Sequence, residues 1–147
     1  MVTYRPAAPA DAEACIVLRG QTRENAIRAV TLASYGITAE SSAQSIETGR
    51  SSGVVCIDAN RIVGYCFGDN HTGEILVLAL LPAYEGRGIG KTLLSHIVTD
   101  LRKIGHQRLF LGCSRSPEHR SYGFYRHLGW KPTATADAHG DEVLELF

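Results

Sequence analysis

The stretch 84-YEGRGIGKTLLSHI-97 carries glycines at alternate positions, Gly86, Gly88 and Gly90, directly before an apolar pattern with helical spacing. Glycines remove side chains from one side of a backbone. Consecutive main-chain N–H groups of residues 86 to 91 can therefore converge on an anion at the start of a helix. A diphosphate fits such a site, so the segment predicts a phosphate-binding turn between a strand and a helix.

Two common phosphate motifs do not fit this segment. The Walker A pattern GxxxxGK[ST] would end at Gly90-Lys91-Thr92, but it needs a glycine where this sequence has Glu85. A carboxylate that faces a triphosphate is costly. The dinucleotide pattern GxGxxG fails in both frames, because its last position falls on Lys91 or Leu93. A shorter xxxGxG turn remains.

The composition predicts one globular domain with a small partner. A chain of 147 residues is too short for two full domains, so we expect a single domain over 1–147. Fifteen basic and fifteen acidic residues cancel, which argues against nucleic acid and anionic membranes as partners. No stretch has the layout of a signal peptide or the length to cross a bilayer, so we expect a cytoplasmic protein. The four cysteines are dispersed, with no CxxC pair, so we predict no metal site.

Turn residues and hydrophobic periodicity divide the chain into alternating helical and β-rich runs. The first third reads as mainly helical, and an antiparallel meander follows it. The expected elements are a strand over 2–6, helices over 12–18, 23–35 and 38–49, strands over 53–59, 61–68 and 74–81, a helix from the glycines to 105, a strand over 108–113, a helix over 118–128 and a strand over 141–147.

This order predicts an α/β (α+β mixed) fold, with a central mixed, mostly antiparallel sheet and helices on both faces. The run 74–81 is apolar at nearly every position, so we expect a central strand that is covered on both faces. A helix connects this run to 108–113, which makes the two strands parallel neighbours.

The segment PAYEGRGIGKTLL resembles the acetyl-coenzyme A loop of the Gcn5-related N-acetyltransferases (GNAT), whose pattern is [QR]xxGx[GA] after a strand. Gly88 and Gly90 match this pattern, and Glu85 stands where the family usually has Gln or Arg. The stretch 124-FYRHLGW-130 resembles the family's FYxxxGF helix, and the opening YRPAAPADAEA resembles its first strand and helix. The resemblance covers nearly the whole chain.

The resemblance implies a V-shaped splay between the two parallel strands and acetyl-CoA as the co-substrate. Backbone amides would bind the diphosphate, with positive charge from Arg87 or Lys91. The pantetheine arm would pair with the strand before the loop, much as an added strand would. The cofactor-binding residues implied are Leu78, Ala79, Leu80, Gly86, Arg87, Gly88, Ile89, Gly90 and Lys91.

Glu74 and Tyr125 are the candidate catalytic residues. An alkylamine has a pKa of about 10 and needs help to lose its proton. Glu74 precedes Gly88 by the same spacing as the catalytic glutamate of the histone-acetylating branch, which suggests a general base; an exposed, inert strand-start residue is the alternative. The resemblance implies that Tyr125 is the general acid for the coenzyme A sulfur, and a core aromatic is the alternative. A backbone amide, at Leu80, would stabilise the oxyanion.

The sequence therefore predicts an N-acetyltransferase that moves an acetyl group from acetyl-CoA directly to a primary amine. The alternatives are an acyl-CoA-binding sensor without turnover and a nucleotide-binding regulator that uses Gly90-Lys91-Thr92. A small-molecule or peptide amine is the expected acceptor, selected by segments 20–49 and 132–141. Three acidic residues near the second segment would attract a cationic substrate: Asp137, Asp141 and Glu142. Dimers are frequent in the family, so a homodimer is a further expectation.

Overall fold

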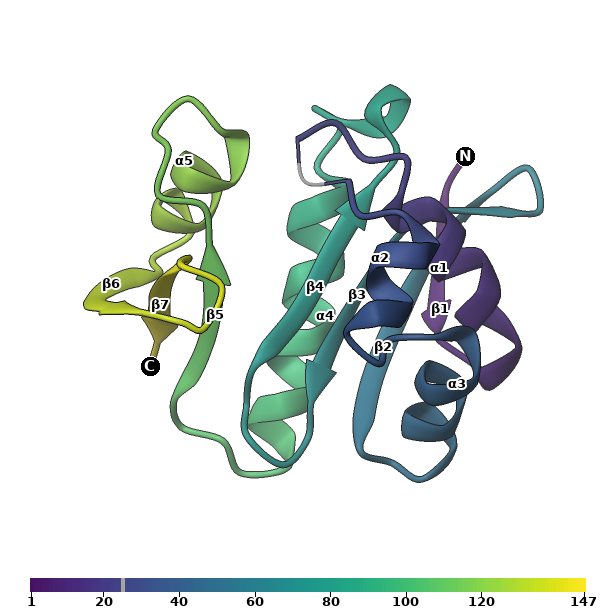
Figure 1. Cartoon of the computed structure of the whole chain (residues 1–147), viewed down its shortest axis with the longest axis horizontal. Helices are drawn as coiled ribbons and strands as arrows, with labels where there is room; N and C mark the ends of the chain where they lie inside the picture. The colour runs from purple at the N-terminus through teal and green to yellow at the C-terminus, as the bar shows by residue number, and fades with distance from the viewer. Residues whose placement is uncertain (25) are drawn as a thin grey trace.

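The computed structural model describes residues 1–24 and 26–147 (Figure 1). Helices and strands alternate much as the sequence predicts. In chain order they are β1 (Thr3–Pro6), η1 (Pro9–Asp11), α1 (Ala12–Arg19), α2 (Ala29–Ser34), α3 (Ala39–Glu47), β2 (Ser51–Asp58), β3 (Arg61–Asp69), β4 (Ile75–Leu80), η2 (Pro82–Tyr84), α4 (Ile89–Lys103), β5 (Leu109–Cys113), α5 (Arg120–His127), β6 (Lys131–Ala136) and β7 (Glu142–Leu146).

The strands form two antiparallel sheets, in the orders β1-β2-β3-β4 and β5-β7-β6. Figure 1 shows β4 and β5 running in the same direction, with the second sheet set to one side of the first. Glu74 and Phe110 form an isolated parallel bridge between them, and the Phe110 N–H donates to the Gly73 carbonyl at 3.3 Å. The mixed, mostly antiparallel fold with a splay between two parallel strands is therefore confirmed.

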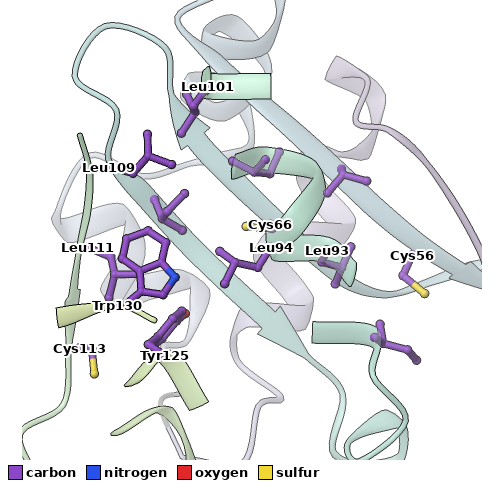
Figure 2. Packing of buried hydrophobic residues seen from close by; sticks show 14 of the residues in the cluster. Cys56, Cys66, Leu93, Leu94, Leu101, Leu109, Leu111, Cys113, Tyr125 and Trp130 are labelled. Carbon is purple, nitrogen blue, oxygen red and sulfur yellow. The ribbon is translucent and has the colours of Figure 1, made fainter. Parts of the chain in front are cut away.

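Helices cover both faces of the larger sheet. The apolar face of α4 packs on one side, where Leu93, Ile97 and Leu101 are fully buried. Figure 2 shows Leu93 and Leu101 in this cluster. On the other side, Cys15 and Leu18 of α1 pack in a second apolar cluster. Each fully buried leucine or isoleucine contributes about 1.5–3 kcal/mol, so α4 anchors the loop that precedes it. No helix in the described ranges is long and apolar enough to span a membrane.

The predicted helix over 23–35 is wrong in its first half. Only Ala29–Ser34 is helical, and residue 25 lies outside the described residues. The Ile27 N–H donates to the carbonyl of Arg19 at 3.0 Å, which ties the segment to the end of α1. This tertiary contact outweighs the helical propensity of the preceding residues.

The segment 132–141, expected to be a loop, contains most of an unpredicted strand, β6. Lys131 pairs with Glu145 and Ala136 with Glu142, and the register shifts between these two pairs. Ala134 has a φ of 64°, and nearly every β6 side chain is exposed. An irregular, exposed strand with a proline as its second residue lacks the period-two pattern by which strands are recognised.

The expectation that β4 is a central strand is wrong, although its side chains pack in the apolar clusters on both faces of the sheet. The strand is the edge of its sheet, and the side chain of Leu76 is 48% exposed. The β3–β4 register shifts between Phe67 and Gly68, which leaves Leu76 as the extra residue of a bulge. The continuous apolar run hides this bulge, because no polar residue marks the change of face.

Candidate active site

The loop between β4 and α4 presents its main chain to solvent. Gly86 and Gly88 have φ values of 75° and 79°, in the left-handed region that favours glycine. A Cβ atom added at either glycine would meet no heavy atom within 4 Å, so the approach to this backbone is open. Gly88 is the N-cap of α4, and the Thr92 N–H is bonded to its carbonyl at 3.1 Å.

Among the described residues, no main-chain N–H from Gly86 to Lys91 donates a hydrogen bond within the chain. The first N–H groups of a helix lack intrahelical partners, and the helix dipole adds partial positive charge at this end. The loop therefore has the properties of an anion site, as the sequence predicts. Gly90 lies inside the first turn, where an added Cβ would make an ordinary contact of 3.7 Å with Phe124.

The side chains of the loop do not all face the same way. The guanidinium of Arg87 lies 5.0 Å from the centre of the Tyr84 ring, and the Tyr84 hydroxyl donates to Asp58 at 2.6 Å. Arg87 is thus directed toward the end of β2, and its main chain rather than its charge borders the loop. Lys91 is exposed on the first turn of α4.

Glu85, the residue that departs from the family pattern, is engaged by two arginines. Its carboxylate accepts from Arg23 Nε at 3.1 and 3.2 Å, and Arg120 Nη1 lies 3.1 Å from Oε2. These partners are 62 residues before Glu85 and 35 residues after it along the chain. Sequence reasoning missed this network, because nothing local pairs charges that are so far apart.

The strand β4 has one edge bonded to β3 and the other toward β5. The Leu81 N–H donates to the Val63 carbonyl at 2.9 Å. Hydrogen bonds to one neighbour alternate along an antiparallel strand, so the main-chain groups of Leu78 and Leu80 point away from β3 and into the splay. Ala79 instead turns its main-chain groups to β3, and its side chain is buried.

Tyr125 projects from α5 into the core, with 9% of its surface exposed. Its ring packs edge-on against Phe124 and Trp130, with centroid distances of 5.0 and 6.1 Å; Figure 2 shows it beside Trp130. Burial raises the pKa of Tyr125, and the nearby thiols of Cys66 and Cys113 raise it further. The phenol therefore keeps its proton at neutral pH and is available as a hydrogen-bond donor.

Arg19 brings a positive charge to the same region from α1. Burial lowers its pKa, and its charge interacts with Tyr65 and Tyr125. Arg19 is not among the residues predicted from the sequence, because a basic residue in the last turn of a helix is ordinary.

Glu74 stands directly before β4, where the two sheets meet. Its side chain is half-buried rather than exposed. Burial raises the pKa of Glu74, and the charges of Asp69 and Asp137 raise it further. A carboxylate with a raised pKa is a stronger base than an ordinary glutamate.

The candidate groups are spread along β4. Cys66, one of the thiols near the Tyr125 phenol, pairs with Leu78 in the β3–β4 register, so the phenol lies near the level of Leu78. Strands rise about 3.3 Å per residue, so Glu74 and Leu80 are about 20 Å apart along the strand. The structure thus brings Tyr125 near Leu78 and keeps Glu74 toward the end where the sheets join.

The two segments expected to select the acceptor meet near Glu74. The rings of Tyr35 and His139 lie 5.8 Å apart, which joins the end of α2 to the turn between β6 and β7. Burial raises the pKa of Asp141, and the charge of Asp137 raises it further. Glu142 instead pairs with Arg126. Within the described part of the chain, no group of three or more His, Cys, Asp or Glu side chains is arranged to hold a metal ion.

The model of the acetyltransferase (GNAT) family matches residues 25–130. The chain belongs to the GNAT family. This match covers the loop, α4 and α5, the elements that form the candidate site.

Curated relatives of this GNAT chain are named N-acetyltransferases. An uncharacterized N-acetyltransferase of Mycobacterium tuberculosis (strain ATCC 25618 / H37Rv) is 33% identical over 78 residues, which cover 51% of this chain and 49% of the relative. A protein of Mycobacterium bovis (strain ATCC BAA-935 / AF2122/97) matches to the same extent. The chain spans about half the length of the curated relatives it matches.

Solved structures share the fold over the whole chain. The paia N-acetyltransferase of Thermoplasma acidophilum, in complex with coenzyme A, has a TM-score of 0.82 at 20% identity, over 99% of this chain and 98% of that one. The structure of yncA from Salmonella typhimurium, with its cofactor acetyl-CoA, has a TM-score of 0.74 at 18% identity, over 99% and 93%. At these identities the similarity shows the GNAT fold alone.

Proposed function

We propose that this GNAT chain transfers an acetyl group from acetyl-CoA directly to a primary amine. The observation that carries the proposal is the row of unbonded main-chain N–H groups from Gly86 to Lys91, at the end of β4 where the two sheets lie apart. Similar structures that contain coenzyme A or acetyl-CoA support this choice of co-substrate.

The residues present fit the cofactor at two points. Gly86 and Gly88 leave the loop backbone open, so the amides up to Lys91 would hold the diphosphate. Leu78 and Leu80 would offer their main-chain groups to the pantetheine amides, as an added strand does. Arg87 would contribute its amide rather than its charge, because its guanidinium is stacked on Tyr84.

The bound thioester would supply an activated acetyl group. Main-chain N–H groups that face the splay, at Leu80 or Leu78, would donate to the carbonyl oxygen as it gains negative charge. Tyr125 would donate its phenol hydrogen bond to the departing sulfur. Since a phenol is protonated at neutral pH and can donate to the thiolate, we assign Tyr125 the acid's role.

Glu74 would accept the proton that the amine must lose. Because Glu74 and Leu80 are about 20 Å apart along β4, we propose that the proton passes from the amine to Glu74 along a chain of several water molecules. The acidic groups around Glu74 would also favour an acceptor amine that enters as a cation. A small molecule and a peptide N-terminus both satisfy this requirement. A cytoplasmic location and a homodimer remain predictions.

A mixing assay tests the proposal. The chain is incubated with acetyl-CoA and a panel of primary amines, and free thiol is measured together with the acetylated product. We expect one thiol released for each acetyl group transferred. Binding of acetyl-CoA without turnover on any amine would favour the sensor instead, and protection from heat by ATP but not by coenzyme A would favour the nucleotide regulator.

A further inference from the structure

Charged side chains from three separate segments meet beside residues 86 to 91, which we call the cofactor loop. Both carboxylate oxygens of Glu85 accept from Arg23 Nε, and Oε2 also lies 3.1 Å from Arg120 Nη1. The Glu85 side chain is only 14% exposed, whereas those of Arg23 and Arg120 are 56% and 61% exposed. A shielded carboxylate thus holds two arginines that remain open to solvent.

The neighbouring residue Glu24 makes a second attachment. Its carboxylate accepts from the main-chain N–H of Arg120 at 3.0 and 3.3 Å, at the first residue of α5. Residues 23 and 24 therefore join the segment between α1 and α2 to both sides of the splay. Arg23 reaches the loop that follows β4, and Glu24 reaches the helix that follows β5.

This network adds little to the stability of the fold. Ion pairs that involve exposed arginines contribute little to folding, because water screens the charges and long side chains lose entropy. Glu85 also directly precedes Gly86, so its negative charge stands next to the amides proposed for the diphosphate. A carboxylate in that place opposes anion binding unless cations neutralise it.

We propose that Arg23, Glu85 and Arg120 position the segment 20–24 against the cofactor loop, so that the cofactor and the amine bind cooperatively. The inference rests on the proposed function, since it needs a diphosphate on residues 86 to 91. When that anion arrives, the guanidinium groups of Arg23 and Arg120 gain a second acceptor beside Glu85. The segment is then fixed at both of its attachments, and it is part of the region expected to select the acceptor.

Cooperative binding requires that the two sites influence each other equally. The cofactor loop and the acceptor segment are here joined by side-chain bonds rather than by distant packing. Glu85, which stands in place of the family's usual Gln or Arg, connects the two through its bonds to Arg23 and Arg120. Arg23, Glu85 and Arg120 are thus positioning residues, and none of them acts on the reacting atoms.

Hydrogen–deuterium exchange of the full chain, with and without saturating coenzyme A, tests the proposal. We expect coenzyme A to slow exchange at residues 86 to 91 and, about fivefold or more, at residues 20 to 24. In Glu85→Gln, the loop should still be protected, because the substitution removes a negative charge beside the phosphates. The protection at residues 20 to 24 should be lost.

Arg108→Gln is the matched control. It breaks another partly exposed ion pair, Arg108 with Glu145 at 2.7 Å, which is not part of the loop network. Both regions should respond to coenzyme A in this variant as they do in the unaltered chain. Protection of the loop alone in the unaltered chain would overturn the coupling and leave the proposed function standing. Absence of protection at the loop itself would count against the proposed function.

Kinetics with the first amine that the chain acetylates give a second readout. Arg23→Gln and Glu85→Gln should each raise the amine KM about fivefold or more, with a smaller change in kcat. The double variant should lose no more than the more damaging single variant, because both remove one interaction. Arg23→Lys should recover part of the loss. An unchanged amine KM in both single variants would contradict the proposal.

Discussion

At the scale of single residues, Tyr125 offers the sharpest distinction between a core residue and a catalytic one. Its ring packs against Phe124 and Trp130, but no hydrogen bond of its hydroxyl is found among the described residues. Tyr125→Phe should therefore leave the melting temperature and the affinity for coenzyme A nearly unchanged. Turnover should fall about 100-fold, as for loss of a general acid. Steady-state kinetics and calorimetry check both halves, and an unchanged rate would return Tyr125 to the core.

Glu74 should affect activity and stability in opposite directions. Its folded pKa is raised above the unfolded value, so the folded state binds the proton more tightly, and the stability due to this group decreases as pH rises through the folded pKa. At neutral pH the ionised carboxylate is thus a cost to the fold. Glu74→Gln should raise the melting temperature while it lowers kcat/KM about 100-fold.

The pH profile separates the two roles of Glu74. In the unaltered chain, kcat/KM should rise with pH as the carboxyl loses its proton, with a midpoint above the ordinary glutamate value of 4.5. The Glu74→Gln variant should lack this rising limb of the kcat/KM profile. A variant that melts at a lower temperature and keeps the limb would show that another group is the base.

At the scale of elements, the junction of the loop with α4 depends more on the glycine at position 88 than on the glycine at position 90. Gly88 has a φ of 79°, where a side chain costs about 1–2 kcal/mol, so Gly88→Ala should weaken coenzyme A binding about tenfold. Gly90 lies in the helix, and its added Cβ would make an ordinary contact with Phe124. Gly90→Ala is therefore the control, with affinity nearly unchanged in calorimetry. Equal losses in both variants would contradict this reading of the turn.

The elements also show what a sequence can predict. The helix α4 was predicted well, because its leucines and isoleucines recur at helical spacing and Gly105 ends it. The strand β6 was missed, because its residues are exposed and its register shifts near Pro132. The helix predicted for the α2 region is too long, because a hydrogen bond from the Ile27 N–H to the Arg19 carbonyl, rather than local propensity, determines where α2 begins.

In the candidate site, too, local features can be predicted from the sequence and long-range contacts cannot. The glycines of the loop were found from their spacing, since a main-chain anion site depends on local conformation alone. Tyr125 and Glu74 were found through the family resemblance. The burial of Tyr125 and its distance from Glu74 depend on how α5 and the strands pack, which the sequence does not show. The pairing of Glu85 with Arg23 and Arg120 follows from the fold, since it joins residues far apart in the chain.

At the scale of the whole molecule, two sheets are joined by a parallel bridge at Glu74 and Phe110. The larger sheet, covered by helices on both faces, holds the cofactor loop rigidly through α4. The smaller sheet carries the acidic turn near Glu74. Under the proposed function, a ligand that enters between the sheets would meet main-chain donors from the larger sheet and the Tyr125 phenol from beside the smaller one.

The structure of this chain in complex with coenzyme A tests the central claim most directly. We expect the diphosphate oxygens within hydrogen-bond distance of the amides from Gly86 to Lys91, and the pantetheine arm against Leu78 and Leu80 with its sulfur near Tyr125. Coenzyme A bound elsewhere, with these amides facing only water, would contradict the proposed site and the acetyl transfer built on it.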